Sequence, residues 1–206
     1  MKTKAKVKKP PDLSKQTIRA AALRLIDEHG LAEFSTRKLG QALGCEAMAI
    51  YWYYPSKDAL LDAVADLLMT GAGAALAPQP DWIGTLRAVA HAYRKIAHDH
   101  PNAFLLLATR RFASEDTFEF LDKLFELARA QGITDRVTAR YYRVVSSYCS
   151  GFALNELAAP RGPQALRRKF PRVDAVSAWL DPQHLDELFS FGLELQLEAL
   201  ARERAR

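Results

Sequence analysis

Residues 35–61 read STRKLGQALGCEAMAIYWYYPSKDALL, a run that sets two short apolar-periodic segments on either side of a glycine. Ser35 or Thr36 can cap a first short helix, because a hydroxyl side chain accepts a hydrogen bond from a free backbone N–H. Gly44 suits the left-handed turn that would end this helix. A second helix is expected over residues 46–53. Two short helices joined by a tight glycine turn predict a helix-turn-helix.

The side chains of this stretch separate into two faces. The apolar positions that can share a core with the preceding helix are Phe34, Leu39, Leu43, Cys45, Ile50 and Tyr54. The positions left without a core to enter are Ala47, Met48, Tyr51, Trp52 and Tyr53. Phosphate oxygens accept hydrogen bonds from Tyr hydroxyl and Trp N–H groups, so this second set predicts a nucleic-acid surface. A patch of rings that binds another protein is the alternative.

The positive charge of the chain is concentrated in the same region. Residues 1–57 hold eleven Lys or Arg against five Asp or Glu, a balance of +6, which leaves −1 for the rest of a chain of net charge +5. A basic front on a near-neutral body indicates a polyanionic partner for the N-terminal part. The first eleven residues carry five lysines and no core-forming pattern, and they serve either as a solubilising tail or as an arm that follows DNA.

The stretch from Ser35 to Leu61 resembles the helix-turn-helix of the TetR family of bacterial transcriptional repressors, whose pattern is roughly T-x-R-x-L-A-x-x-L-G-V…L-Y-x-H-F-x-x-K-x-x-L-L. The positions that agree with the pattern are Arg37, Leu39, Leu43, Gly44, Tyr51, Lys57, Leu60 and Leu61. The departures are mostly mild: Ser35 for Thr, Gly40 for Ala, Cys45 for Val, Ile50 for Leu, Tyr53 for His and Tyr54 for Phe.

This resemblance implies roles in DNA binding. It implies that Arg37 reads a guanine, to which a guanidinium can bond through O6 and N7 together. It implies that Tyr51 contacts a thymine methyl and the backbone. The residues that correspond to phosphate contacts are Thr36, Trp52, Tyr53 and Lys57, the last at a helix N-terminus that attracts anions. A merely solvated Arg37 is the alternative.

The recognition positions differ from those of the tetracycline repressors. Ala47, Met48 and Ala49 stand where those proteins carry Gln, Pro and Thr. A tetracycline operator is therefore not expected as the target.

The remaining chain predicts further helices and no strands, so the fold class is all-α. The expected helices begin with one capped by Ser14 that stops at His29 and Gly30, and one opened by Ser56 and Lys57 that runs to Gly71. Further helices are expected over residues 82–99, 102–112, 117–131, 134–159 and 182 to the end, with a short one at 173–180 inside a long loop. We expect a disordered basic arm at 1–11, a helix-turn-helix DNA-binding domain at 12–57, and a helical ligand-binding and dimerisation domain at 58–206.

The two long late helices, residues 136–158 and 184–201, carry wide apolar faces. A helix-turn-helix regulator needs a dimer, because two recognition helices must reach major grooves about 34–36 Å apart. The final segment LFSFGLELQLEAL and the pair His100-Pro101 resemble the tetracycline-repressor class of C-terminal domains, in which such helices form an intersubunit four-helix bundle. The resemblance therefore implies a homodimer through these helices.

The same resemblance implies a pocket for a small-molecule inducer, whose binding would weaken operator affinity by linkage. The candidate lining residues are polar or aromatic groups among apolar helix faces: His98, His100, Phe104, Leu107, Arg110, Tyr148, Asn155 and Trp179. Ordinary core packing is the alternative for each. The tetracycline repressors hold a metal-chelated drug with a His and an acid; His100 is the candidate for that His, and no acid aligns with it. We therefore assign no metal and no cofactor.

The rival classes have less support. No H-E-x-x-H, glycine-rich phosphate loop or G-x-S-x-G motif occurs, which argues against an enzyme. A nonspecific architectural DNA-binding protein would fit the lysine arm but would not need a large near-neutral helical domain. Cys45 and Cys149, both in apolar helical patterns, are expected to be buried reduced thiols of a cytoplasmic protein. The expected function is a ligand-responsive transcriptional regulator, and repression is the commonest role in the family.

Overall fold

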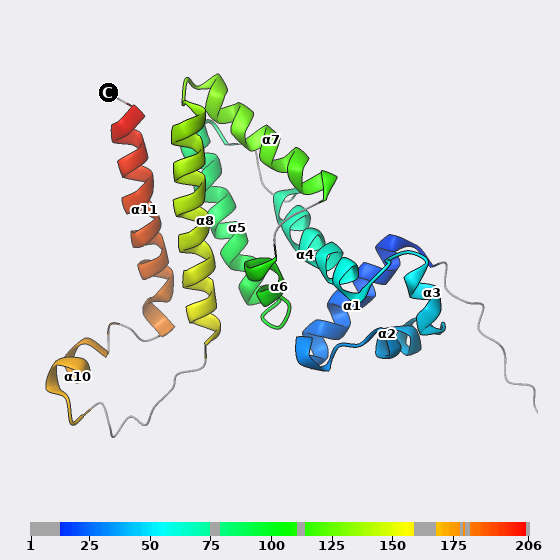
Figure 1. Cartoon of the computed structure of the whole chain (residues 1–206). Coiled ribbons are helices and arrows are strands. Elements are labelled where there is room, and N and C mark those ends of the chain that lie inside the picture. Colours follow the sequence, from blue (N-terminus) through cyan, green and yellow to red (C-terminus); the bar gives the residue numbers. More distant parts are fainter. Residues whose placement is uncertain are drawn as a thin grey trace, which may run out of the picture. The chain divides into compact units, whose positions relative to one another are not determined.

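The computed structural model describes residues 13–74, 79–110, 114–158, 168–177, 179 and 182–204 (Figure 1). These residues form helices, turns and loops without a strand, so the predicted all-α class is confirmed. The helices are α1 (Lys15–His29), η1 (Leu31–Glu33), α2 (Thr36–Leu43), α3 (Ala47–Tyr51), α4 (Lys57–Ala74), α5 (Trp82–Asp99), α6 (Phe104–Thr109), α7 (Glu115–Ala130), α8 (Asp135–Leu157), α10 (Pro171–Ser177), η3 (Pro182–His184) and α11 (Leu185–Arg204). The predicted basic arm at 1–11 lies outside the described residues.

The chain divides into two compact units. The first unit comprises residues 1–71 and 100–118, and the second comprises 72–99 and 119–206. The sequence places the boundary between the DNA-binding domain and the ligand-binding domain after residue 57, on the basis of function. The compact units are defined by packing instead, and the start of α4 belongs to the same unit as the helix-turn-helix. The functional domain limits stay a prediction.

In the first unit, α1 begins at a capping box. The Ser14 hydroxyl accepts the backbone N–H of Thr17, and the Thr17 hydroxyl accepts the N–H of Ser14 in return. The apolar face of α1 then supplies the core with Ile18, Ala21, Ala22 and Ile26, and the buried side chains of the following segments are Phe34, Leu39, Ile50 and Tyr54. Leu43 and Cys45, expected in this core, are only half-buried.

In the second unit, α5, α8 and α11 lie side by side (Figure 1). Their shared core holds the apolar side chains of Trp82, Leu86, Val145, Cys149, Phe189, Leu193 and Leu197. Burial raises the pKa of the Cys149 thiol to about 12, so this cysteine stays protonated at neutral pH.

A charged cluster joins these three helices. Arg94 of α5 is only 8% exposed, and its guanidinium donates to both carboxylate oxygens of Glu156 on α8, at 2.7 and 2.5 Å. The same guanidinium lies 2.8 Å from Asp186 on α11 and 4.9 Å from the ring centre of Phe189. Because a buried charge is costly without partners, this pairing favours one arrangement of the three helices.

Several helices differ from their predicted ranges, among them α6, α10 and α3. The predicted helix at 102–112 is α6, which begins only at Phe104, and the one at 173–180 is α10, which begins at Pro171, a residue favoured in a first turn. The second helix of the helix-turn-helix, predicted to end at Tyr53, is α3 and ends at Tyr51.

Candidate nucleic-acid interface

The turn between α2 and α3 has the geometry that the sequence predicts. Ser35 caps α2 by accepting the N–H of Lys38 at 3.2 Å. Gly44 ends α2 in the left-handed conformation, with φ 68° and ψ 30°. The N–H of Cys45 then donates to the carbonyl of Gly40 at 2.9 Å, which brings the chain back across the end of α2.

Gly40 allows α2 and α3 to approach closely. A Cβ atom at this position would lie 2.8 Å from the Cys45 carbonyl oxygen and 3.1 Å from the Ala47 nitrogen. Both of these are backbone atoms, which cannot rotate away. An alanine at this position, as in the family pattern, would require this corner to shift.

The outer face of α3 is open to solvent. Met48 is 67% exposed, Trp52 after the helix is 89% exposed, and Tyr51 is 37% exposed. The Tyr51 hydroxyl lies 3.3 Å from the hydroxyl of Thr36 on α2, so the two helices meet at this face. Large apolar side chains left open in this way mark a binding surface.

Arg37 is exposed on α2, beside Thr36. Within the described part of the chain, no hydrogen bond or ion pair holds its guanidinium. Lys38, its neighbour, is instead paired with Glu33 at 2.7 Å. Arg37 therefore keeps its donors for a ligand.

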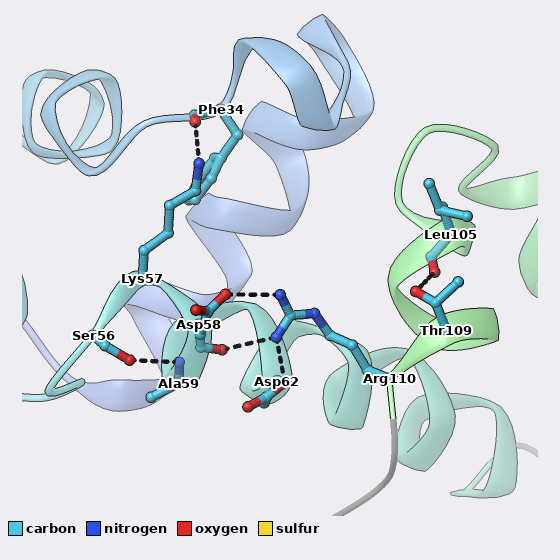
Figure 2. A network of polar contacts seen from close by, with 9 residues as sticks. All are labelled: Phe34, Ser56, Lys57, Asp58, Ala59, Asp62, Leu105, Thr109 and Arg110. Carbon is cyan, nitrogen blue, oxygen red and sulfur yellow. Dashed lines mark hydrogen bonds and ion pairs between the residues drawn. The ribbon is translucent and has the colours of Figure 1, made fainter.

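Besides Thr36, whose hydroxyl contacts that of Tyr51, two more of the predicted phosphate contacts already have partners inside the protein. The Tyr53 hydroxyl donates to the carbonyl of Leu13 at 2.8 Å, and the side chain is half-buried. The Lys57 ammonium donates to the carbonyl of Phe34 at 3.0 Å and lies 5.5 Å from the centre of that ring (Figure 2). An ammonium has three donors, so Lys57 retains two for a phosphate. For Tyr53, a phosphate contact stays a prediction that would require the hydroxyl to change partner.

Tyr54 adds a second tie between the end of this motif and α1. Its hydroxyl donates to the carbonyl of Lys15 at 2.9 Å, and burial raises the pKa of this phenol. Together with Tyr53, it fixes the segment after α3 to the start of α1.

A polar network at the start of α4 was not predicted from the sequence. The guanidinium of Arg110, which follows α6, donates to the Asp62 carboxylate at 2.5 Å and to the Asp58 carboxylate at 3.0 Å (Figure 2). Burial disfavours the charge of Arg110, but its bonds to Asp62 and Asp58 outweigh this and raise the pKa above its ordinary value. The four-residue spacing of the two acids on α4 is the only signal in the sequence.

The other candidate ligand residues fall into both compact units. In the first unit, Phe104 and Leu107 are buried, and His100 Nδ1 lies 2.7 Å from the Asp27 carboxylate on α1. The candidates of the second unit are His98, Tyr148, Asn155 and Trp179. Neither unit alone contains the whole predicted pocket, and these ligand roles stay predictions.

Tyr148 has a clear structural role. Its hydroxyl donates to the carbonyl of Phe189 at 2.9 Å and approaches Gly192 so closely that a Cβ there would lie 2.4 Å from it.

Among the described residues, no three His, Cys, Asp or Glu side chains converge as metal ligands. None of the described helices is long and apolar enough to cross a membrane.

The fold and this exposed face define a helix-turn-helix protein with a separate helical body. Residues 18–64 match the family model for bacterial regulatory proteins of the tetR family, and residues 75–203 match the model for the tetracyclin repressor-like C-terminal domain.

Individual relatives agree with these matches. The chain is 27% identical over 202 residues to the tetracycline repressor protein class G of Vibrio anguillarum, covering 94% of this chain and 96% of that protein. A crystal structure of a possible TetR family transcriptional regulator from Streptomyces coelicolor has a TM-score of 0.78 and 28% identity, covering 92% of this chain and 99% of that one. A TetR variant from Acinetobacter baumannii in complex with minocycline has a TM-score of 0.74 and 26% identity, covering 94% and 99%.

This chain belongs to the TetR family. It is a ligand-responsive transcriptional regulator with an N-terminal helix-turn-helix and a tetracycline-repressor-like C-terminal domain. Regulators of this family bind DNA operators as dimers and respond to small-molecule ligands.

Proposed function

We propose that the protein represses transcription by binding a palindromic operator as a homodimer, and that a small-molecule inducer releases it. The observation that carries this proposal is an exposed Arg37 without a partner among the described residues, next to Thr36, whose hydroxyl lies 3.3 Å from that of Tyr51, together with the exposed Met48, Tyr51 and Trp52. A cation with free donors beside exposed rings fits a partner that offers phosphates and base edges.

The proposed contacts divide by chemistry. Arg37 reads a guanine through O6 and N7, and Ala47, Met48 and Tyr51 meet the floor of the major groove. Thr36, Trp52, Tyr53 and Lys57 bind phosphates. Lys57 is the first residue of α4, an 18-residue helix whose N-terminus favours an anion.

An exposed apolar surface supports the dimer. On α8 the exposed apolar side chains are Val144, Leu154 and Leu157, and on α11 they are Phe191 and Leu195. Both helices also contribute to the core of the second unit, so they are anchored while they present these side chains. A second copy of the same two helices would cover this surface and complete a four-helix bundle.

Relatives supply the support for an inducer. The names of the curated relatives include several tetracycline repressors, and one solved neighbour contains minocycline. The dimer has two helix-turn-helix motifs, and their arrangement either fits the operator or does not. An inducer lowers operator affinity only if it binds the arrangement that does not fit more tightly than the one that does. We propose this linkage for a small molecule held among the candidate residues of the C-terminal domain.

The test compares DNA from the promoter next to the protein's own gene with a scrambled duplex of the same length. A specific repressor is expected to prefer the promoter fragment by about a thousandfold or more at physiological salt. Equal affinity for the two duplexes would instead favour the nonspecific architectural alternative. In the same titration, compounds that raise the melting temperature of the protein are added, and an inducer is expected to release the promoter fragment.

A further inference from the structure

The exposed face of α3 has almost no hydrogen-bonding chemistry. The helix reads Ala47, Met48, Ala49, Ile50 and Tyr51, without an amide, a guanidinium or a carboxylate. Ile50 is buried in the core, and the one polar side-chain atom, the Tyr51 hydroxyl, lies 3.3 Å from the Thr36 hydroxyl. Side chains that bond two atoms of one base, such as Arg, Asn and Gln, are therefore missing from this helix.

The major groove offers one group that an apolar side chain can recognise. Guanine, cytosine and adenine present donors and acceptors there, whereas thymine adds a C5-methyl group. Met48 is suited to this methyl because its side chain is 67% exposed, unbranched and polarisable, and adapts its shape to what it meets. Tyr51 follows three residues later and therefore lies on the same side of the helix.

We infer that Met48, with the ring of Tyr51 beside it, reads thymine methyl groups, so that the operator pairs facing α3 are A·T pairs and thymine is required for its methyl. This inference rests on the proposed function. It assigns the two readouts to different helices: Arg37 on α2 selects guanine by hydrogen bonds, and Met48 on α3 selects thymine by apolar contact.

Glu46 offers the one competing readout next to α3. Glu46 is the residue before the helix, it is exposed, and its side chain makes no capping hydrogen bond. A carboxylate can accept a hydrogen bond from cytosine N4, which would specify a G·C pair. Phosphates repel this carboxylate, so the apolar readout is favoured.

The test begins by selecting the operator from a pool of random duplexes with the full-length protein. The thymines in the part of the half-site that the protein protects are then replaced with deoxyuridine one at a time. Each replacement removes only the methyl group. Burial of one methyl-sized group is worth about 0.8 kcal/mol, so dissociation constants are expected to rise about fourfold for one half-site and about fifteenfold for both.

The variant Met48→Ala separates this readout from a general effect of uracil on the duplex. It is expected to lose the part of the deoxyuridine penalty that Met48 causes and to keep only the part that the ring of Tyr51 causes, while Glu46→Gln keeps the full wild-type penalty. Because both side chains are exposed, thermal melting is expected to show both variants folded.

The methyl readout and the proposed regulator function are contradicted by different results. If wild type binds the deoxyuridine operator as tightly as the thymine operator, or if Met48→Ala keeps the full wild-type penalty, the methyl readout by Met48 is wrong and the regulator function stands. If the selected half-site has cytosine opposite α3 and Glu46→Gln removes that preference, the readout is also wrong. If selection enriches no duplex at all, the proposed function and the readout fail together.

Discussion

Arg37 and Lys57 both carry positive charge, but they have different surroundings. Arg37 has no partner among the described residues, whereas Lys57 donates to the Phe34 carbonyl. Arg37→Ala is expected to cost about 1–3 kcal/mol of operator binding and to relax sequence choice. Lys57→Ala is expected to weaken binding to every duplex. It is also expected to reduce the slope of the logarithm of the binding constant against the logarithm of salt concentration by about one unit.

Titrations at several salt concentrations, on operator and on random duplex, check these two expectations. Lys123→Ala serves as the control, because Lys123 is an exposed cation on α7 that is paired with Glu119, and its loss should leave DNA affinity unchanged. An equal loss on both duplexes for Arg37→Ala would show that this residue does not read a base.

Gly40 gives a second prediction at the scale of one residue. Gly40→Ala is expected to destabilise the protein by about 1–3 kcal/mol, because the added methyl meets the fixed backbone at Cys45 and Ala47. Gly71→Ala is the matched control: it lies in α4 with nothing within 4 Å of a new Cβ, so it should be neutral or stabilising by up to about 1 kcal/mol. Urea unfolding measures both, and equal effects would contradict the close approach.

Among the elements, the end of α6 is tied to the start of α4 by Arg110. The guanidinium holds Asp62 and Asp58 together, and its side chain is less exposed than either carboxylate. Arg110→Ala is expected to lower the free energy of unfolding by about 1 kcal/mol, with a coupling to Asp62→Ala of about 0.5 kcal/mol or more. Lys123→Ala again provides the control, because its ion pair with Glu119 is more exposed than the Arg110 pairs and should contribute less. Additive effects of Arg110→Ala and Asp62→Ala in urea unfolding would mean that the two residues do not interact.

Local signals in the sequence predicted several element boundaries well. Ser14 has a hydroxyl that can cap a helix, and Gly44 lacks the Cβ atom that disfavours a left-handed turn, so the start of α1 and the end of α2 were both predicted. The end of the helix now labelled α3 was predicted at Tyr53, two residues beyond its observed end at Tyr51, because Tyr53 and Tyr54 bond to the carbonyls of Leu13 and Lys15, far away in the chain. No local pattern carries that information.

The same reason explains what was missed around the candidate site. The α6 start was predicted at Asn102, whose amide instead donates to the Asp27 carbonyl on α1. Arg110 pairs with carboxylates 48 and 52 positions earlier in the chain, which no local pattern indicates, and its role in a ligand pocket stays a prediction. The exposed ring face of α3 could be predicted because its side chains match a family motif, whereas ion pairs between distant helices depend on the assembled fold.

At the scale of the whole molecule, the proposed function requires a dimer. We expect the exposed apolar side chains of α8 and α11 to form its interface. Replacing both Phe191 and Leu195 with Glu is expected to place charges in the interface and give a monomer with much weaker operator binding. Phe118→Glu is the control, because Phe118 is a similarly exposed ring on α7 in the other compact unit. Light scattering coupled to size exclusion measures the molar mass; a dimeric double variant would show that the interface lies elsewhere.

Hydroxyl-radical footprinting of the selected operator tests the central claim most directly. If two copies of α3 enter the major groove, the wild-type protein should protect two windows on one side of the duplex, about 10–10.5 base pairs apart and related by a dyad. Arg37→Ala should weaken both windows equally. A single window, or uniform protection along the duplex, would contradict a symmetric pair of reading heads.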